Sequence, residues 1–197
     1  MKQVLILSLA IVSLCITIRA QNVYDDAEAY AVYSAIVFKE WPVTEAKSTR
    51  LVIKLETSDY PHIGGGIDEC LQPPKGEEAV YAPVVNAYKE ANKTPKLLQP
   101  KFTTDIPYVF MSGTEFNAFF DKKGIDGWKD FYDEYPKSGG INELSAVGFN
   151  ADKTLAIVYV GHSCGGLCGG GTYHVLQKKE GKWTELQWRG SSCMWAS

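Results

Sequence analysis

Residues 154–177 read TLAIVYVGHSCGGLCGGGTYHVLQ, and this stretch decides the fold that the sequence predicts. β-Branched and aromatic residues fill its two ends, which is typical of β-strands. The glycines between them permit a turn, because glycine adopts backbone conformations that other residues avoid. Turn residues separate this hairpin from the segments 144–149 and 183–188, each of which predicts one further strand. We therefore expect an antiparallel meander of four strands in the C-terminal part of the chain.

Helical periodicity dominates the chain before this meander. Apolar residues recur there at three- and four-residue spacing. Helices are predicted to begin near Asp25, Pro83, Thr114 and Asp126. Shorter apolar runs predict strands at 49–57 and 108–111. Helices first and a meander last indicate an α+β fold, in which N-terminal helices are followed by a four-stranded antiparallel meander within a single domain.

Residues 1–20 have the pattern of a secretory signal peptide. Lys2 precedes an apolar core at 4–18, and the small Ala20 offers a cleavage site. The apolar core is too short to span a bilayer comfortably, and no later segment resembles a membrane span. We expect residues 21–197 to form one exported α+β domain, periplasmic or secreted, with no membrane span after signal removal.

The charge balance argues against nucleic acid as a partner. The chain has a formal net charge of −3, and removal of residues 1–20 deletes two basic residues and no acidic one, which gives −5. An acidic surface provides no electrostatic attraction to a phosphate backbone or to anionic lipid. The sequence does not specify which partner the protein binds.

Four cysteines remain in the expected mature chain, and an even number in an exported protein predicts disulfides. Three connectivities are possible for two bridges among Cys70, Cys164, Cys168 and Cys193. A bridge between Cys164 and Cys168 would close the glycine-rich turn and remove conformational entropy from the unfolded chain. That bridge would leave Cys70 to pair with Cys193 by elimination.

Three other interpretations of residues 161–174 compete with this structural one. Residues 161–165 match the G-x-S-x-G nucleophile elbow, but no helix is predicted after them and no Asp follows Ser163. Two imidazoles and two thiolates suit zinc or copper, and these candidate ligands are His162, Cys164, Cys168 and His174. Their spacing matches no standard zinc site, and exported thiols oxidise readily. The two cysteines of a redox dithiol are usually separated by two residues and lie at a helix N-terminus, whereas three residues separate Cys164 from Cys168. From these mismatches we predict neither a metal nor another cofactor.

A second glycine-rich loop, residues 58–76, contains the same residue types. Loops of this length are often functional. If a disulfide brings the two loops together, one pocket would be lined by His62, Asp68, His162 and His174. The simpler interpretation is that His62 and His174 are ordinary half-exposed residues. No catalytic residue is predicted.

Between Phe131 and Trp183 the sequence resembles a signature of uncharacterised exported bacterial proteins. The matching positions are Phe131, Tyr132, Tyr135, Pro136, Gly140, Leu144, Ser145, Val147, Gly148, Phe149, Asn150, Ala156, Tyr159, Val160, Gly161, Cys164, Gly165, Leu167, Cys168, Gly169, Gly171, Gly181, Lys182 and Trp183. The resemblance covers about the C-terminal third of the chain. It implies an exported bacterial origin, and it implies no activity, cofactor or catalytic residue.

Two classes of function remain open. As a noncatalytic binding or interaction module, the protein would contact a partner through residues 58–76 and 162–172. As a metal- or thiol-dependent enzyme, it would need a pocket that joins the Cys/His-rich loops, with a bound metal or a histidine of perturbed pKa. We expect the disulfide-stapled binding module, because no group of residues meets the geometric requirements of catalysis from sequence alone.

Overall fold

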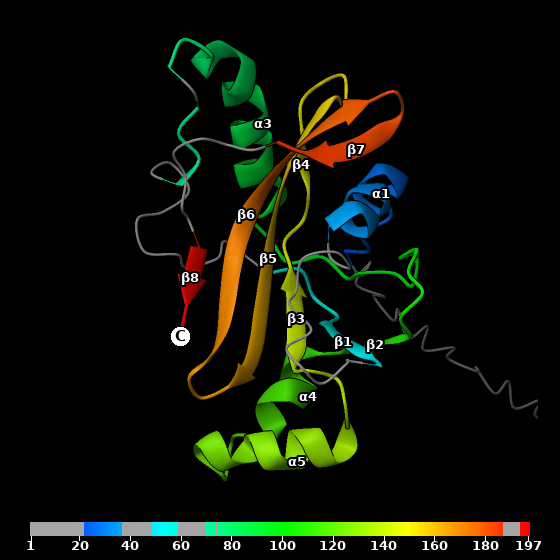
Figure 1. Cartoon of the computed structure of the whole chain (residues 1–197), viewed down its shortest axis with the longest axis vertical. Helices are drawn as coiled ribbons and strands as arrows, with labels where there is room; N and C mark the ends of the chain where they lie inside the picture. The colour runs from blue at the N-terminus through cyan, green and yellow to red at the C-terminus, as the bar shows by residue number, and fades with distance from the viewer. Residues whose placement is uncertain (1–21, 37–48, 59–69, 74, 187–193) are drawn as a thin grey trace, which may run out of the picture.

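The structure is a computed structural model, and it describes residues 22–36, 49–58, 70–73, 75–186 and 194–197 (Figure 1). The strands in these ranges are β1 (Leu51–Lys54), β2 (Tyr108–Met111), β3 (Ile141–Leu144), β4 (Gly148–Phe149), β5 (Leu155–Gly165), β6 (Cys168–Lys179), β7 (Lys182–Glu185) and β8 (Met194–Ala196). The helices are α1 (Ala27–Ile36), α3 (Glu78–Ala91), α4 (Gly113–Ala118) and α5 (Gly127–Glu134), with the 3-10 turn η1 (Gly124–Asp126) before α5. None of these helices is long and apolar enough to cross a membrane.

The described strands form one mixed sheet of eight strands. Its order is β2-β1-β3-β5-β6-β7, with β4 beside β5 and β8 beside β6. β1 pairs in parallel with β2 and with β3, and the other pairings are antiparallel. β5 and β6 form a long hairpin, in which Gly166 and Leu167 make the turn.

The predicted fold class, N-terminal helices followed by a four-stranded antiparallel meander, is wrong. The run β4-β5-β6-β7 is only one part of a larger mixed sheet, and α3, α4 and α5 lie between strands of the chain. The physical reason lies in β1, where Val52 and Ile53 are both fully buried although successive side chains of a strand point to opposite faces. A strand that is buried on both faces belongs in the interior of a sheet, so β1 takes β2 and β3 as parallel neighbours.

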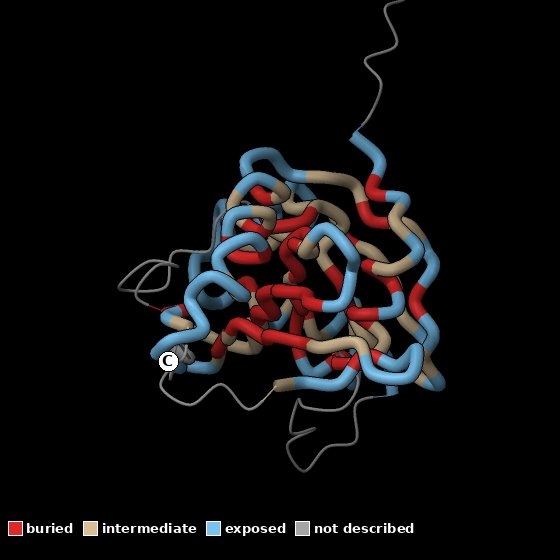
Figure 2. Tube along the Cα trace, turned by 90° about the horizontal axis from the view of Figure 1, so that it is seen from above, coloured by how far each residue is buried: buried red, intermediate tan, exposed pale blue. Residues whose placement is uncertain are grey.

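Helices cover both faces of the sheet. α1 packs on the face to which Ile53 points, in a cluster of buried residues that includes Val158 and Val160 of β5. α4 and α5 contribute the residues that pack on the opposite face, around Val52. α3 packs on that opposite face beside β5 and β6, and the buried segments lie inside a shell of exposed ones (Figure 2). The prediction that a helix begins near Pro83 is wrong, because α3 begins at Glu78.

Candidate functional site

The tip of the β5–β6 hairpin holds the predicted staple. Cys164 on β5 and Cys168 on β6 form a disulfide, with their Cα atoms 5.0 Å apart. Cys70 is also disulfide-bonded, and it is fully buried. Cys193, the predicted partner of Cys70, lies outside the described residues, so that pairing stays a prediction.

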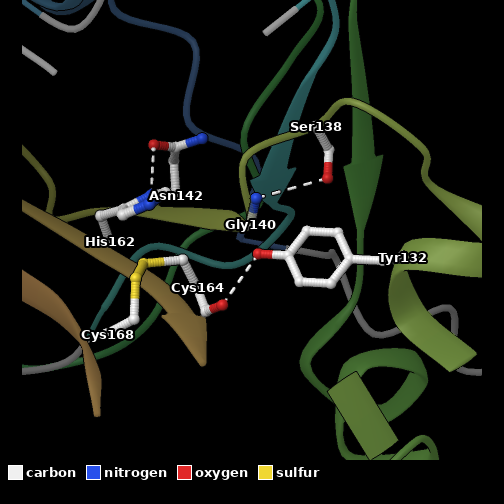
Figure 3. Close-up of a disulfide and its surroundings, with 7 residues drawn as sticks. All are labelled: Tyr132, Ser138, Gly140, Asn142, His162, Cys164 and Cys168. Atoms are coloured by element: carbon white, nitrogen blue, oxygen red, sulfur yellow. Dashed lines mark hydrogen bonds between the residues drawn. A yellow bond between two sulfur atoms is a disulfide. The ribbon is translucent and has the colours of Figure 1, made fainter. Parts of the chain in front are cut away.

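Two contacts from outside the hairpin hold this tip in place (Figure 3). The Tyr132 hydroxyl on α5 donates a hydrogen bond of 2.8 Å to the Cys164 carbonyl. Gly140, which has a φ of 115°, lies so close to β5 that a Cβ there would be 2.9 Å from Cys164 Cα. The disulfide and these two contacts together give the turn a defined position relative to α5.

Glycines 169–171 make room for the C-terminal strand β8. Gly171 lies opposite Trp195 in the β6–β8 pairing. A Cβ on Gly171 would lie 2.6 Å from Trp195 Nε1, which donates a hydrogen bond of 2.8 Å to the Tyr159 hydroxyl. In the sequence the turn alone accounts for these glycines, and nothing in their spacing indicated the indole that packs beside them.

His162 and His174 lie on the same face of the hairpin but do not meet. His162 is opposite Gly170, and His174 is opposite Val158, so the histidines are four residue steps apart along the strands, which corresponds to roughly 13 Å. His162 Nδ1 lies 3.3 Å from Asn142 Oδ1 on β3 (Figure 3). The predicted pocket that contains both histidines is therefore not formed by the hairpin.

His174 is buried at the other end of the hairpin. Its Nδ1 atom lies 2.7 Å from Glu185 Oε1 on β7, and only 4 % of the residue is exposed. The prediction of half-exposed histidines is wrong for this residue. His62 and Asp68, the other members of the predicted loop site, lie outside the described residues.

The oxidised tip lacks groups that the metal and hydrolase interpretations need. The disulfide leaves no thiolate on Cys164 or Cys168, so two of the four candidate metal ligands are already used. Within the described ranges, no group of three or more His, Cys, Asp or Glu side chains could hold a metal ion. Ser163 lies inside β5, which continues to Gly165, and not at the strand-to-helix elbow that the hydrolase motif requires.

A charged cluster that no sequence pattern indicated joins two strands of the sheet. Lys54 Nζ on β1 is 3.1 Å from Glu143 Oε1 on β3. The Ser58 hydroxyl donates a hydrogen bond of 3.3 Å to Glu143 Oε2. Both carboxylate oxygens of Glu143 thus have a donor within the chain, and we assign this cluster the structural role of joining β1 to β3.

Leu167 and Ile125 form an exposed apolar patch, which we call the tip patch. Leu167 is 88 % exposed, and Ile125 of η1 is 66 % exposed. Ile125 lies beside Gly166, the residue that precedes Leu167 in the chain, because a Cβ on that glycine would lie 2.8 Å from Ile125 Cγ1. Apolar side chains that gather on a surface indicate a contact site, whereas scattered ones do not. Leu167 stands out in the sequence as the apolar residue of a glycine-rich turn, but nothing in the sequence indicated Ile125.

A groove of about 500 Å³ lies between α4 and α5. Its apolar lining includes Met111, Ala118, Phe119 and Tyr135. Its acidic lining consists of Glu115, Asp130 and Glu134. The groove therefore suits an apolar group that is accompanied by positive charge.

Comparisons of the chain with protein-family models, with curated proteins and with solved structures find no match. The resemblance to uncharacterised exported bacterial proteins stays a prediction. Function therefore has to be inferred from the geometry of the described residues.

His162 predicts a pH dependence of stability. Burial lowers the pKa of His162, and a backbone hydrogen bond with Gly139 opposes this shift. The unfolded chain thus binds a proton at a pH at which folded His162 is still neutral, so stability is lost as the pH falls below about 6.5, the unperturbed histidine pKa. We expect His162→Gln, which cannot titrate, to lose less stability than the wild type between pH 8 and pH 5 in urea unfolding. Equal losses in the two proteins would contradict this expectation.

Proposed function

We propose that the protein is an exported, disulfide-stapled, noncatalytic interaction module that contacts a partner protein through the tip patch. The observation that carries the proposal is the 88 % exposure of Leu167 at the turn of a disulfide-closed hairpin. This side chain contributes little to the folded chain while it stays in water. Its burial in a contact would contribute about 1.5–3 kcal/mol.

The tip patch is preorganised for binding. A flexible loop loses conformational freedom when it binds, and this loss reduces its affinity. Here the Cys164–Cys168 disulfide and the hydrogen bond from Tyr132 restrict the turn before any partner arrives. Ile125 belongs to η1, directly before α5, and Leu167 lies in the turn that the disulfide closes.

Two aliphatic side chains fit a concave apolar pocket on a protein, where a few buried residues supply most of the binding energy. The net charge of −3 offers no electrostatic attraction to nucleic acid or to anionic lipid. The alternative, a metal- or thiol-dependent enzyme, would use Cys164 and Cys168, whose sulfur atoms are bonded to each other. Contact through the tip patch needs no reduced thiol.

Site-specific photo-crosslinking tests this proposal in cells that export the full chain. A photoreactive amino acid replaces Leu167 in one protein and Val80 in the control, because Val80 is 56 % exposed and lies on α3, away from the tip. We expect a discrete adduct from position 167 and none from position 80. Adding Ile125→Asp should lower the yield from position 167 by about tenfold or more, because it places a charge in the contact.

Two results would count against the tip patch as a contact surface. One is a set of similar adducts from positions 167 and 80, which would indicate random collision. The other is an adduct at position 167 whose yield is unchanged by Ile125→Asp, which would separate the adduct from the patch.

A further inference from the structure

The disulfide-bonded cysteines of the described residues differ in their access to solvent. Cys70 is fully buried. In the Cys164–Cys168 bond, by contrast, Cys168 is exposed and Cys164 is half-buried. A disulfide is reduced when a thiolate attacks one of its sulfur atoms, so the rate depends on access to that atom. A thiol from outside therefore reaches the hairpin tip more readily than it reaches the bond of Cys70.

The two cysteines of the tip are held unequally. The Tyr132 hydroxyl donates its hydrogen bond to the Cys164 carbonyl (Figure 3), and a Cβ on Gly140 would lie 3.0 Å from Cys164 Cβ. Cys164 is thus packed against other parts of the molecule, whereas Cys168 begins β6 on its solvent-exposed side of the turn. Attack at the Cys168 sulfur is the accessible route, and it leaves the Cys164 sulfur in place as the departing thiolate.

Opening this bond loosens the tip and leaves the sheet intact. The β5–β6 pairing is regular up to Ser163, and a register shift separates it from the last pair, Gly165 with Cys168. Beyond Ser163, that pair and the disulfide join the two strands. The turn also contains Gly166, and glycine has more backbone freedom to regain than any other residue. The cysteines are only 4 positions apart, and a bond that closes so short a ring contributes little to the stability of the whole fold.

We infer that the Cys164–Cys168 disulfide is a thiol-exchange site that switches the tip patch: the patch is presented while the bond is closed and is lost when a dithiol reductant opens it. This inference rests on the proposed function and names its regulation. One thiolate of the reductant attacks the Cys168 sulfur, the disulfide breaks, and Cys164 leaves as a thiolate. The second thiolate of the reductant then attacks the mixed disulfide and releases Cys168. The reductant departs as a disulfide, and its two protons pass through water to the two cysteine sulfurs.

The position of Leu167 connects this chemistry to binding. Leu167 lies inside the ring that the disulfide closes, and the preceding Gly166 packs beside Ile125. In the open form the turn has to be ordered again when it binds, and this loss of conformational freedom lowers its affinity. The Cα atoms of Cys164 and Cys168 are 5.0 Å apart on paired strands, so the sheet keeps both thiols within reach of each other. The switch is therefore reversible by oxidation.

Limited reduction of the full oxidised chain tests the exchange site. The folded protein is treated with dithiothreitol, its free thiols are blocked with N-ethylmaleimide, and the labelled positions are found by peptide mass mapping. We expect Cys164 and Cys168 to be labelled at least about 100-fold faster than Cys70, because reduction of a buried bond has to wait for the structure to open. Cys70 is the internal control, since it is also disulfide-bonded but fully buried.

Hydrogen exchange of the reduced, blocked wild type shows how far the change spreads without any substitution. We expect amides within residues 164–168 to exchange at least about tenfold faster than in the oxidised protein, because their local opening no longer breaks a covalent ring. Amides of β5 before Ser163 should exchange at the same rate in both samples. Reoxidation of an unblocked sample with oxidised glutathione should restore the slow exchange.

The photo-crosslinking assay at position 167 tests the switch itself. The double variant Cys164→Ser with Cys168→Ser keeps the tip open, and urea unfolding confirms that it folds. We expect its adduct yield to be about tenfold or more below that of the disulfide-bonded chain, because the turn has to be ordered on binding.

The possible failures have different meanings. An adduct from the double variant as strong as that from the disulfide-bonded chain overturns the switch and leaves the tip patch as a contact surface. Absence of any adduct from the disulfide-bonded chain removes the proposed function and, with it, the switch. Labelling of Cys70 as fast as the tip cysteines, or labelling of Cys164 and Cys168 only in denaturant, overturns the exchange site.

Discussion

Phe131→Ala is expected to lower the free energy of unfolding by about 3–5 kcal/mol, the range for removal of a buried aromatic ring. Phe131 on α5 is fully buried. It packs in one cluster with Val52, Met111 and Ile141 of the sheet, and its ring centroid lies 5.4 Å from that of Trp128. The variant loses these contacts and leaves a cavity that α5 cannot close without moving.

Guanidinium denaturation of the wild type and the variant measures this effect. Lys129→Ala is the control, because Lys129 lies on the same helix with 78 % of its side chain exposed, and its removal should change stability by about 0.5 kcal/mol or less. A loss below about 1 kcal/mol for Phe131→Ala would show that α5 is not firmly packed on the sheet. In that case α5 would not hold Tyr132 in position to donate its hydrogen bond to the hairpin tip.

Gly148→Ala is expected to destabilise the protein by about 3 kcal/mol, the upper part of the range for overpacking a buried site. Gly148 on β4 faces α3, and a Cβ there would overlap backbone atoms of Tyr88 and lie 2.6 Å from Tyr88 Cβ. Backbone atoms of a helix cannot rotate away as a flexible side chain can. The added methyl group therefore has to move α3 off the sheet.

Thermal and urea unfolding of Gly148→Ala and of the wild type measure this loss of stability. Gly113→Ala is the control, because the nearest atom to its added Cβ is Lys54 Cε, at 3.3 Å on a flexible side chain. We expect the control to change stability by about 0.5 kcal/mol or less. Equal stability of the two variants would show that α3 does not approach β4 as closely as described.

Part of the candidate site could be predicted from local patterns. The glycine-rich run between two β-branched segments indicated the β5–β6 hairpin, and the paired cysteines beside the turn indicated its disulfide, because each feature depends on residues close in sequence. Only one of the two residues of the tip patch could be predicted from the sequence. Leu167 lies in the turn itself, whereas Ile125 reaches Gly166 from an element about forty positions earlier.

The histidines show why residue type is a weak guide to a site. His162 and His174 share a glycine-rich motif, but the strand geometry directs one toward Asn142 and the other toward Glu185. Their separation follows from the pairing of β5 with β6, which places four residue steps between them. Composition alone could not distinguish this arrangement from a common pocket.

By itself, the sequence determined the features that depend on neighbours along the chain: the hairpin, its glycine turn, its disulfide and the apolar character of Leu167. Only the tertiary structure decided that β1 enters the sheet in parallel between β2 and β3, that Trp195 packs beside Gly171, and that Ile125 joins Leu167. The physical reason is that the spacing of apolar residues shows which side chains are buried, whereas the pairing of strands depends on how surfaces from distant parts of the chain pack together. In this protein the pairing depends on β1, which is buried on both faces, and on Gly166 and Gly171, which allow Ile125 and Trp195 to pack closely.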